Sequence, residues 1–323
     1  MSLEYKRINS QKPCKPGINL LKITGPHLYY TNITVTFKQT MKFYGLLILS
    51  LYSYVLSAQY SKEQLKEFRI ITDMMDSVKK NSYLRCNMRS LERVETGYAA
   101  ASTSIKVQAM PRKCYLRNAE KKLEVLYNAD LSKNKCVVKP HVFPYFTLNL
   151  DPSGNLMRKN QHFTIFELGF EFIGKTIAIA LSKEKDQIAK HLTLMPNKVE
   201  KNKMNCHLFV YENNSFGYHD YVVQDKETVS SIAAKFVVND YMVRTKNKLY
   251  DDYGYLKKGS VIKVPTFYCK KALFYIDDKT LLPVCVIIYD EVGLFESYEY
   301  FDLEINKPIP ASEFMKNFKG YGF

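Results

Sequence analysis

A short polar segment, "LMRKNQHFTI", places four side chains that could do chemistry beside a turn: Arg158, Asn160, Gln161 and His162. This crowding invites a catalytic interpretation. The same residue types also cap helices and satisfy buried backbone groups, with His162 at the entry to the segment that follows. We favour the capping interpretation and keep the four residues as a candidate functional cluster of the larger domain.

The other motifs of hydrolases do not assemble. Zinc hydrolases need clustered histidines and carboxylates, and the histidines after residue 59 are scattered without an H-E-x-x-H or H-x-H spacing. Cys206 and His207 are neighbours in a predicted strand, so their side chains should point to opposite faces. A Cys/His nucleophile pair is therefore not expected.

Serine and carboxylate patterns are equally weak. Ser-x-x-Lys begins at Ser77, Ser132, Ser182 and Ser260, which a lysine-rich chain produces by chance, and the companion motifs are missing. Glu167 and Glu171 lie one helical turn apart, which fits a solvated face better than glycoside chemistry. We expect no enzyme, no cofactor and no metal.

A segment with the pattern of a secretory signal sequence begins at Met41. "MKFYGLLILSLYSYVLSAQYS" has one lysine, an apolar run from about Tyr44 to Val55, and the small pair Ser57-Ala58. The run is too short for a membrane-spanning helix, so residues 41–58 are predicted to be a signal peptide cleaved after Ala58. Residues 1–40, polar and without periodicity, are predicted to be a spurious or unstructured extension.

Charge and cysteine content take their meaning from export. The formal net charge is +15, and residues 1–58 hold seven basic residues and one acidic residue, which leaves +9 for residues 59–323. An exported basic protein meets an anionic wall or lipid surface rather than nucleic acid. Six cysteines remain after residue 58, which permits disulfides in an oxidising compartment, although small buried thiols are an equal alternative.

Periodicity predicts a sheet domain with helices. An amphipathic helix is expected over 61–81, followed by strands with period two in "TSIKVQAM" and "KKLEVLYN", one face of which would be covered. Asp151-Pro152-Ser153-Gly154 matches a type I turn. Residues 161–192 look helical, with a possible interruption at Gly174, and strands return in "NCHLFVYE", "ALFYID", "LLPVCVIIYD" and "LFESYEYFDLEI".

A small helical unit interrupts these strands. Val229, Ile232, Ala233 and Phe236 form one apolar stripe of a short helix that Thr228 can cap. A second helix is expected after Asn239, and "LKKGSVIKVP" predicts a glycine turn and a strand. The predicted order is strand, helix, helix, strand.

This unit, residues 219–266, resembles the LysM module. The matching positions are Tyr221, Val223, Thr228, Ser231-Ile232-Ala233, Phe236, Asn247, Leu256, Gly259 and Pro265. The resemblance implies binding of N-acetylglucosamine glycans, commonly peptidoglycan, in a shallow groove between the loop that opens the first helix and the loop before the last strand. The implied groove residues are Lys226, Glu227, Thr228, Val229 and Asn247.

One departure from the LysM pattern bears on function. The family has Gly-Asp where this chain has Lys226-Glu227. Glycine allows a backbone to approach a ligand closely. The unit is therefore expected either to bind a glycan or to be a degenerate module kept for packing or protein contact.

The host domain, residues 59–218 and 267–323, resembles a family of secreted bacterial proteins of unknown function that often carries a LysM insertion. The resemblance rests on "SIKVQAMPRKCYLR", "KKLEVLY", "FTLNLDPSGNLMRKNQHFTIFELGFEFI" and "LPVCVIIYDEVGLFESYEYFDLEIN". More distantly, the domain looks like outer-membrane lipoprotein carriers. That likeness implies an α+β fold: an antiparallel half-barrel sheet with a helical lid around an apolar cavity.

We accordingly predict a secreted, periplasmic, non-enzymatic protein that binds peptidoglycan through its LysM-like βααβ module. The alternative is that the half-barrel cavity binds a lipid or lipoprotein, which requires an open apolar pocket of several hundred Å³. A cell-wall hydrolase is a third hypothesis. No nucleic-acid partner is expected, and contact with a membrane is expected only through the cleaved signal peptide.

Overall fold

A computed structural model of the chain describes residues 61–131, 133–184 and 187–323. The predicted extension 1–40 and signal peptide 41–58 lie outside these described residues. All described elements and all three hydrophobic clusters belong to one compact unit, Ala58–Phe323.

Twelve strands form the main sheet of the described residues. They are β1 (Tyr83–Val94), β2 (Gly97–Gln108), β3 (Lys113–Asn118), β4 (Leu123–Asn128), β5 (Cys136–Pro140), β6 (Leu148–Leu150), β7 (Leu192–Leu194), β8 (Val199–Lys201), β9 (Met204–Glu212), β12 (Lys271–Asp277), β13 (Pro283–Tyr289) and β14 (Leu294–Ile305). Their order is β6-β5-β4-β3-β2-β1-β14-β13-β12-β9-β7, with β8 beside β9, and all pairs are antiparallel. The end strands β6 and β7 do not pair with each other, so the sheet is open.

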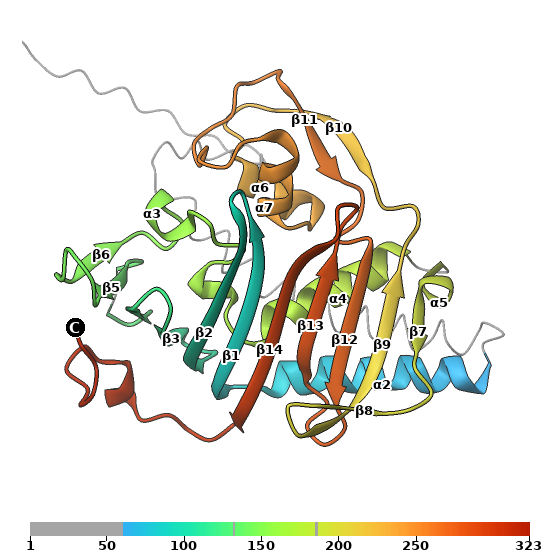
Figure 1. Ribbon diagram of the computed structural model, residues 1–323, viewed down its shortest axis with the longest axis horizontal. Helices are drawn as coiled ribbons and strands as arrows, with labels where there is room; N and C mark the ends of the chain where they lie inside the picture. The colour runs from blue at the N-terminus through green and yellow to red at the C-terminus, as the bar shows by residue number, and fades with distance from the viewer. Residues whose placement is uncertain (1–60, 132, 185–186) are drawn as a thin grey trace, which may run out of the picture. The chain divides into compact units, whose positions relative to one another are not determined.

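Two long helices cover one face of this sheet (Figure 1). They are α2 (Lys62–Lys80) and α4 (Phe170–Glu184). The shorter helical elements are α3 (Asn155–Arg158), η1 (Ile165–Glu167) and α5 (Ile188–His191). The helix predicted over 61–81 is confirmed, because its apolar side chains Ile71, Met74 and Val78 are buried. The α+β class with a large antiparallel sheet is likewise confirmed.

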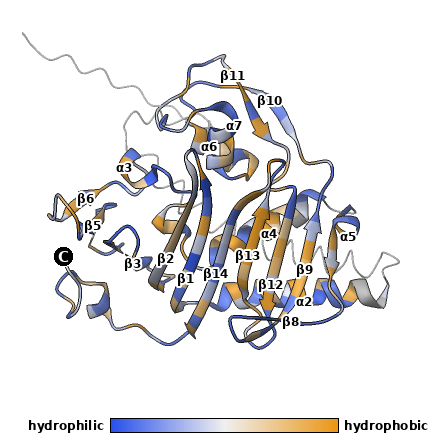
Figure 2. Cartoon of the chain, viewed as in Figure 1, coloured by the Kyte–Doolittle hydropathy of each residue, from blue (hydrophilic) through white to orange (hydrophobic). Residues whose placement is uncertain are grey.

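The main core lies between the helices and the sheet. Strand alternation sends Leu84, Cys86 and Met88 of β1 to this side, opposite Val107, Ile105 and Thr103 of β2. Tyr298 and Tyr300 of β14 join them. The neighbouring strands β12 and β13 are largely hydrophobic (Figure 2), as expected of strands with covered faces.

The opposite sheet face is covered at one end, contrary to the expectation of a single covered face. The C-terminal segment, including η3 (Ala311–Phe314), packs there against β3 and β4. Tyr115 stacks on Tyr321 with ring centroids 3.8 Å apart, and Leu126 contacts the cluster that contains Phe314. The alternation of β4 therefore has apolar residues on both sides, since both of its faces are buried.

The helix predicted over 161–192 is shorter than expected, and it is not interrupted at Gly174. Gly169, with φ +90°, and the capping box of Thr164 with Glu167 delay the helix start until Phe170. Gly174 lies inside α4, where an added Cβ would be 2.8 Å from the Val78 side chain. This glycine is thus the contact at which α4 rests on α2.

A second, two-stranded sheet belongs to the predicted helical unit. β10 (Tyr218–Val222), α6 (Val229–Phe236), α7 (Asp240–Asn247) and β11 (Val261–Pro265) give the strand-helix-helix-strand order expected from the sequence. Thr228 caps α6, as predicted, and α7 begins after Asn239, as predicted; the Asn239 side chain caps it. The unit has its own hydrophobic cluster, centred on Val229, Ile232 and Val264.

An ion pair fastens the C-terminal segment to the sheet and makes a testable prediction. Glu313 accepts hydrogen bonds from Arg85 at 2.5 and 2.6 Å, and Lys106 lies 2.7 Å away, which lowers the Glu313 pKa to about 2. A lowered pKa adds stability that is complete above the ordinary value of 4.5 and lost as the pH falls through about 2. Glu313→Gln should therefore lower the free energy of unfolding at neutral pH by about 1.5–3 kcal/mol.

Urea unfolding measured from pH 7 to pH 2 would test this, with Glu304→Gln as control. Glu304 also faces Arg85, at 3.6 Å, but is more exposed, so its loss should cost about 0–1 kcal/mol. The difference between wild type and Glu313→Gln should shrink as the pH falls below about 4.5. A pH-independent difference would contradict the assignment.

Candidate functional site

A cavity of about 580 Å³ lies between the helix-covered face of the sheet and the segment 156–183. Its walls come mainly from strands β1 to β6, β13 and β14, from α4 and from the loop that precedes it. Apolar residues dominate, among them Met88, Leu116, Leu123, Val125, Val138, Leu150, Met157, Phe163, Leu168, Phe172, Ile173, Ile177, Val286, Ile288 and Tyr300. A cavity of this size and lining is of the kind that holds small apolar ligands.

Small side chains on adjacent strands explain why the core is not filled here. Ala99 and Ala101 of β2 line the cavity, and their register partners on β1 are Glu92 and Ser90. Farther along the same strands the facing pair is Ile105 and Cys86, which belong to the packed core. Protein interiors normally pack densely, so alanine and serine at this end leave space that α4 does not occupy.

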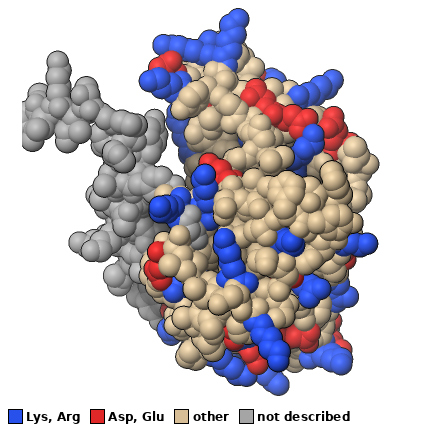
Figure 3. All heavy atoms as spheres, turned by 90° about the vertical axis from the view of Figure 1, so that its left-hand side faces the viewer, with Lys and Arg blue, Asp and Glu red and all other residues tan. Residues whose placement is uncertain are grey.

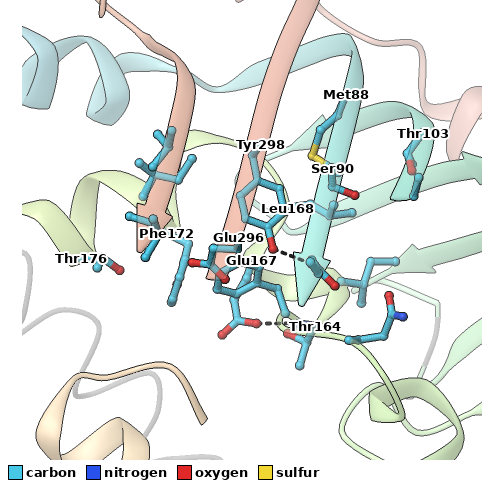
Figure 4. Close-up of a pocket in the computed structure, with 18 of the residues that line it drawn as sticks. Met88, Ser90, Thr103, Thr164, Glu167, Leu168, Phe172, Thr176, Glu296 and Tyr298 are labelled. Carbon is cyan, nitrogen blue, oxygen red and sulfur yellow. Dashed lines mark hydrogen bonds between the residues drawn. The ribbon is translucent and has the colours of Figure 1, made fainter. Parts of the chain in front are cut away.

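Several carboxyl and hydroxyl groups line the same cavity. The Tyr298 hydroxyl donates a hydrogen bond to Glu92, and the Thr164 backbone N–H donates to Glu167 at 2.5 Å (Figure 4). The fully buried Glu296 accepts from Tyr268 at 3.3 Å. The cavity therefore combines a long apolar wall with one acidic, hydrogen-bonding region.

Burial changes the protonation of these groups. Loss of solvation raises the pKa of Glu296 and that of Glu167, and it raises the Tyr298 pKa well above its usual value. A neutral carboxyl group can donate as well as accept a hydrogen bond. The acidic region can thus bind polar ligand groups of either hydrogen-bonding type.

His162, from the candidate cluster, is buried directly behind this region. Its Nδ1 lies 2.7 Å from Glu296 Oε2, and its Nε2 lies 2.9 Å from the Arg93 carbonyl oxygen. Burial lowers the His162 pKa, but the carboxylates of Glu92 and Glu296 outweigh it and raise that pKa overall. The pKa values of His162 and Glu296 are both raised, so the pair holds a proton to a higher pH than the free side chains would.

Arg158 contacts the inserted unit rather than a reaction centre. Its guanidinium donates two hydrogen bonds of 2.6 Å to Asp240, the first residue of α7, and both side chains are buried. Ser230 of α6 donates to the same carboxylate at 2.6 Å. One buried ion pair thereby connects the loop after β6 to both helices of the unit.

The remaining members of the cluster lie beside this contact. Tyr241 of α7 donates a long hydrogen bond of 3.5 Å to Asn160 and stacks on His162 with centroids 4.6 Å apart. Asn160 and Gln161 both line the cavity. We call Arg158, His162, Asp240, Tyr241 and Glu296 the joint, because they fasten the βααβ unit to the sheet.

The residues predicted for a glycan groove have diverse environments. Lys226 is exposed with φ +56°, and the Glu227 carboxylate accepts from Tyr221 at 2.8 and 2.9 Å. Thr228 Oγ1 caps α6 through the Ser231 N–H. The two loops expected to form the groove do meet, because the Leu256 N–H donates to the Glu227 carbonyl at 2.8 Å.

Two of the predicted groove residues are engaged inside the unit. Val229 is fully buried in its core. The Asn247 amide donates to the Val243 carbonyl at 2.8 Å and to the Lys263 carbonyl at 2.7 Å, and it accepts from the Lys263 N–H at 2.7 Å. These contacts hold α7 against β11.

The cysteines show no reactive site. All six in the described residues are free and buried, and burial raises the pKa of Cys86 to about 12 and that of Cys206 to about 11. His207 points away from its neighbour Cys206 and lies 3.0 Å from Asp278. No cluster of potential metal ligands and no helix able to span a membrane occurs in the part of the chain that the structure describes.

Sequence inspection missed the acidic region, although a signal for it exists. In "LFESYEYF" the period-two pattern puts Glu296 on the same face as Tyr298 and Tyr300, which is the core face. A carboxylate on that face marks a buried polar site. Glu92 gives a similar signal, because the alternation that puts Cys86 and Met88 of β1 on the core face also puts Glu92 there.

Fold and site together define an α+β protein with an open antiparallel sheet and an apolar cavity under its helices. Residues 81–235, slightly less than half of the chain, match the family "Protein of unknown function (DUF1571)". The matched segment runs from β1 into α6. The predicted family of unknown function is thereby confirmed. None of the curated proteins matches the sequence.

Several solved structures are similar to this chain at low identity. They include the Mycobacterium tuberculosis lipoprotein LppX, at 13% identity over 75% of this chain and 96% of that chain, with a TM-score of 0.36. The LolA superfamily protein of Nitrosomonas europaea has 8% identity over 80% and 99%, with a TM-score of 0.29. The Pseudomonas aeruginosa MucA/MucB complex has 9% identity over 76% and 59%, with a TM-score of 0.36. The distant likeness to lipoprotein carriers expected from the sequence is found, at TM-scores too low to transfer a function.

The joint makes a prediction for the attachment of the βααβ unit. Arg158→Met leaves Asp240 buried without its main partner, which should lower the free energy of unfolding by about 3–5 kcal/mol. Proteolytic cleavage should appear in the connections near residues 213–217 and 266–270. Limited proteolysis and urea unfolding would measure both effects.

Lys159→Met is the matched control at the next position. Lys159 pairs with Asp251 at 3.2 Å on the surface, where a salt bridge contributes about 0–1 kcal/mol. Equal effects of the two substitutions would show that the buried pair does not fasten the unit.

Proposed function

We propose that this is a non-enzymatic protein of the cell envelope whose cavity holds an acyl chain of a lipid or lipoprotein. The observation that carries the proposal is the apolar cavity of about 580 Å³ under α4. We also interpret the open sheet as a half-barrel and the helices α2 and α4 as its lid. This was the alternative that the sequence left open, and the cavity favours it over glycan binding as the main function.

The chemistry of the walls suits an amphiphile. An acyl chain gains roughly 0.8 kcal/mol for each buried CH₂ group, so a chain with about ten buried methylenes gains several kcal/mol. Glu167 and Glu92 would meet hydroxyl, amide or protonated groups near the chain end. The acidic region would then select the head group, and the apolar wall would supply most of the affinity.

Export supports an envelope location. The predicted signal peptide 41–58 lies outside the described residues, and the six cysteines of the described residues are free and buried. A protein that carries a lipid between envelope sites needs no catalytic group. We propose accordingly that the protein has no enzymatic activity.

Ala101→Phe tests the cavity. Ala101 lines the cavity from β2, so a phenyl ring there would occupy the space that an acyl chain needs. We expect at least a ten-fold loss of affinity for cis-parinaric acid, a fluorescent fatty acid, measured by titration of Ala58–Phe323. Native mass spectrometry should show less co-purified lipid in this variant.

Ser102→Phe is the control, because Ser102 is the next residue of β2 and faces the opposite side of the sheet. It should bind the probe like wild type. The proposal is wrong if wild type does not bind, or if both variants lose binding to the same extent while remaining folded.

A second candidate function is glycan binding by the LysM-like unit, including peptidoglycan. One observation favours it: Lys226, which replaces the glycine of the LysM pattern, has φ +56°. Glycine adopts this backbone conformation without strain. The loop therefore keeps the glycine-type conformation although the residue has changed.

Lys226→Gly should accordingly strengthen retention on insoluble peptidoglycan, because it removes a side chain from the loop and relieves the backbone. Lys203→Gly is the matched control, since Lys203 has φ +63° in the turn between β8 and β9, outside the unit. Pull-down of Ala58–Phe323 and both variants measures the effect. Equal retention of all three proteins, or retention of none, would remove this candidate.

A further inference from the structure

The connection between β5 and β6 presents an unusual group of exposed aromatic side chains. We call residues 141–147, "HVFPYFT", the aromatic loop. Phe143 is 84% exposed, Tyr145 63% and Phe146 56%, and Val142 beside them is also exposed. Single exposed apolar residues are common on proteins, but a contiguous group usually marks an interaction site.

Basic side chains surround this loop. Lys139 precedes it, and Lys121 and Lys122 lie on the β3–β4 connection, where the Lys122 carbonyl accepts the His141 N–H at 2.7 Å. Among the described residues, no carboxylate is within ion-pair distance of these three ammonium groups. The nearby Glu124 is buried and already contacts His141.

The loop lies at the edge of the sheet, because β6 is an end strand. Lysine and arginine side chains project from the surface at this end of the molecule (Figure 3). The loop carries no carboxylate of its own. Lys139 donates a hydrogen bond of 2.5 Å to the Tyr145 carbonyl, within the loop itself. Phenylalanine and tyrosine flanked by lysines that have no carboxylate partner form the combination that binds the interface of an anionic bilayer.

We propose that the aromatic loop is a docking site for an anionic lipid membrane. Phe143 and Phe146 insert among the head groups, and Lys121, Lys122 and Lys139 contact the lipid phosphates. The sequence pattern alone limited membrane contact to the signal peptide, and the folded domain adds this second contact.

The position of the loop relative to the cavity gives the docking a use. The β3–β4 connection holds the aromatic loop through the Lys122 carbonyl. Lys121 of this connection and Leu123, the first residue of β4, both line the cavity. A membrane docked at the loop would thus lie beside one end of the cavity. This inference does not depend on what the cavity binds.

Vesicle flotation tests the proposal. Ala58–Phe323 would be mixed with vesicles of phosphatidylcholine alone or with about a third phosphatidylglycerol. We expect flotation with the anionic vesicles, suppression by 0.5 M salt because screening weakens charge attraction, and at least a ten-fold weaker partition for the double variant Phe143→Ser/Phe146→Ser. Val292→Ser should float like wild type, since Val292 is 74% exposed in the β13–β14 turn, away from the loop.

The outcomes separate this proposal from lipid binding in the cavity. Ala101→Phe should float like wild type even if it no longer binds cis-parinaric acid. Failure of wild type to float, equal flotation with neutral vesicles at high salt, or an equal loss in Val292→Ser would overturn the proposal. Circular dichroism of each variant shows that a loss of flotation does not arise from unfolding.

Discussion

The open antiparallel sheet has one apolar face that must be kept from water, and the rest of the structure depends on how this is done. A closed barrel would cover the face with its own strands, whereas the end strands β6 and β7 do not pair with each other here. Helices α2 and α4 supply the cover instead, and they rest on one another at Gly174 and Val78. Where the strands carry alanine and serine, the cover does not reach the sheet and the cavity remains.

The acidic region follows from the same constraint. Carboxyl groups that face a covered sheet surface need partners, and Glu92 and Glu296 find them in Tyr298, Tyr268 and His162. His162 in turn stacks on Tyr241 of the inserted unit. One network therefore serves both as the polar part of the cavity wall and as the surface on which the βααβ unit is seated.

Much of this architecture follows from sequence patterns that act locally. The helix at 62–80, the period-two strands, the turn at Asp151, the Thr228 cap and the helix start after Asn239 depend on neighbouring residues, and the sequence predicts all of them. The start of α4 was mispredicted, because the apolar residues of 163–168 pack in a loop and a 3-10 turn that share the helical spacing. Gly174 suggests a helix interruption in the sequence, whereas in the structure the close approach of α2 accounts for a glycine at this position.

The candidate site was less predictable, because it depends on strand register. The pattern around residue 158 correctly attracts attention to Arg158 and His162, yet their partners Asp240 and Glu296 are 82 and 134 residues away. The cavity arises from the pairing of Ala101 with Ser90, which no single segment encodes.

The inserted unit also contributes to the cavity itself, through Val237 at the end of α6. This shared residue has a thermodynamic consequence. If a molecule in the cavity contacts Val237, it stabilises the seating of the unit by the same free energy with which the seated unit strengthens that molecule's binding. The two ends of the unit lie side by side, because Gly217 and Thr266 are hydrogen-bonded to each other. The position of the βααβ insertion and the occupancy of the cavity would in that case be thermodynamically linked.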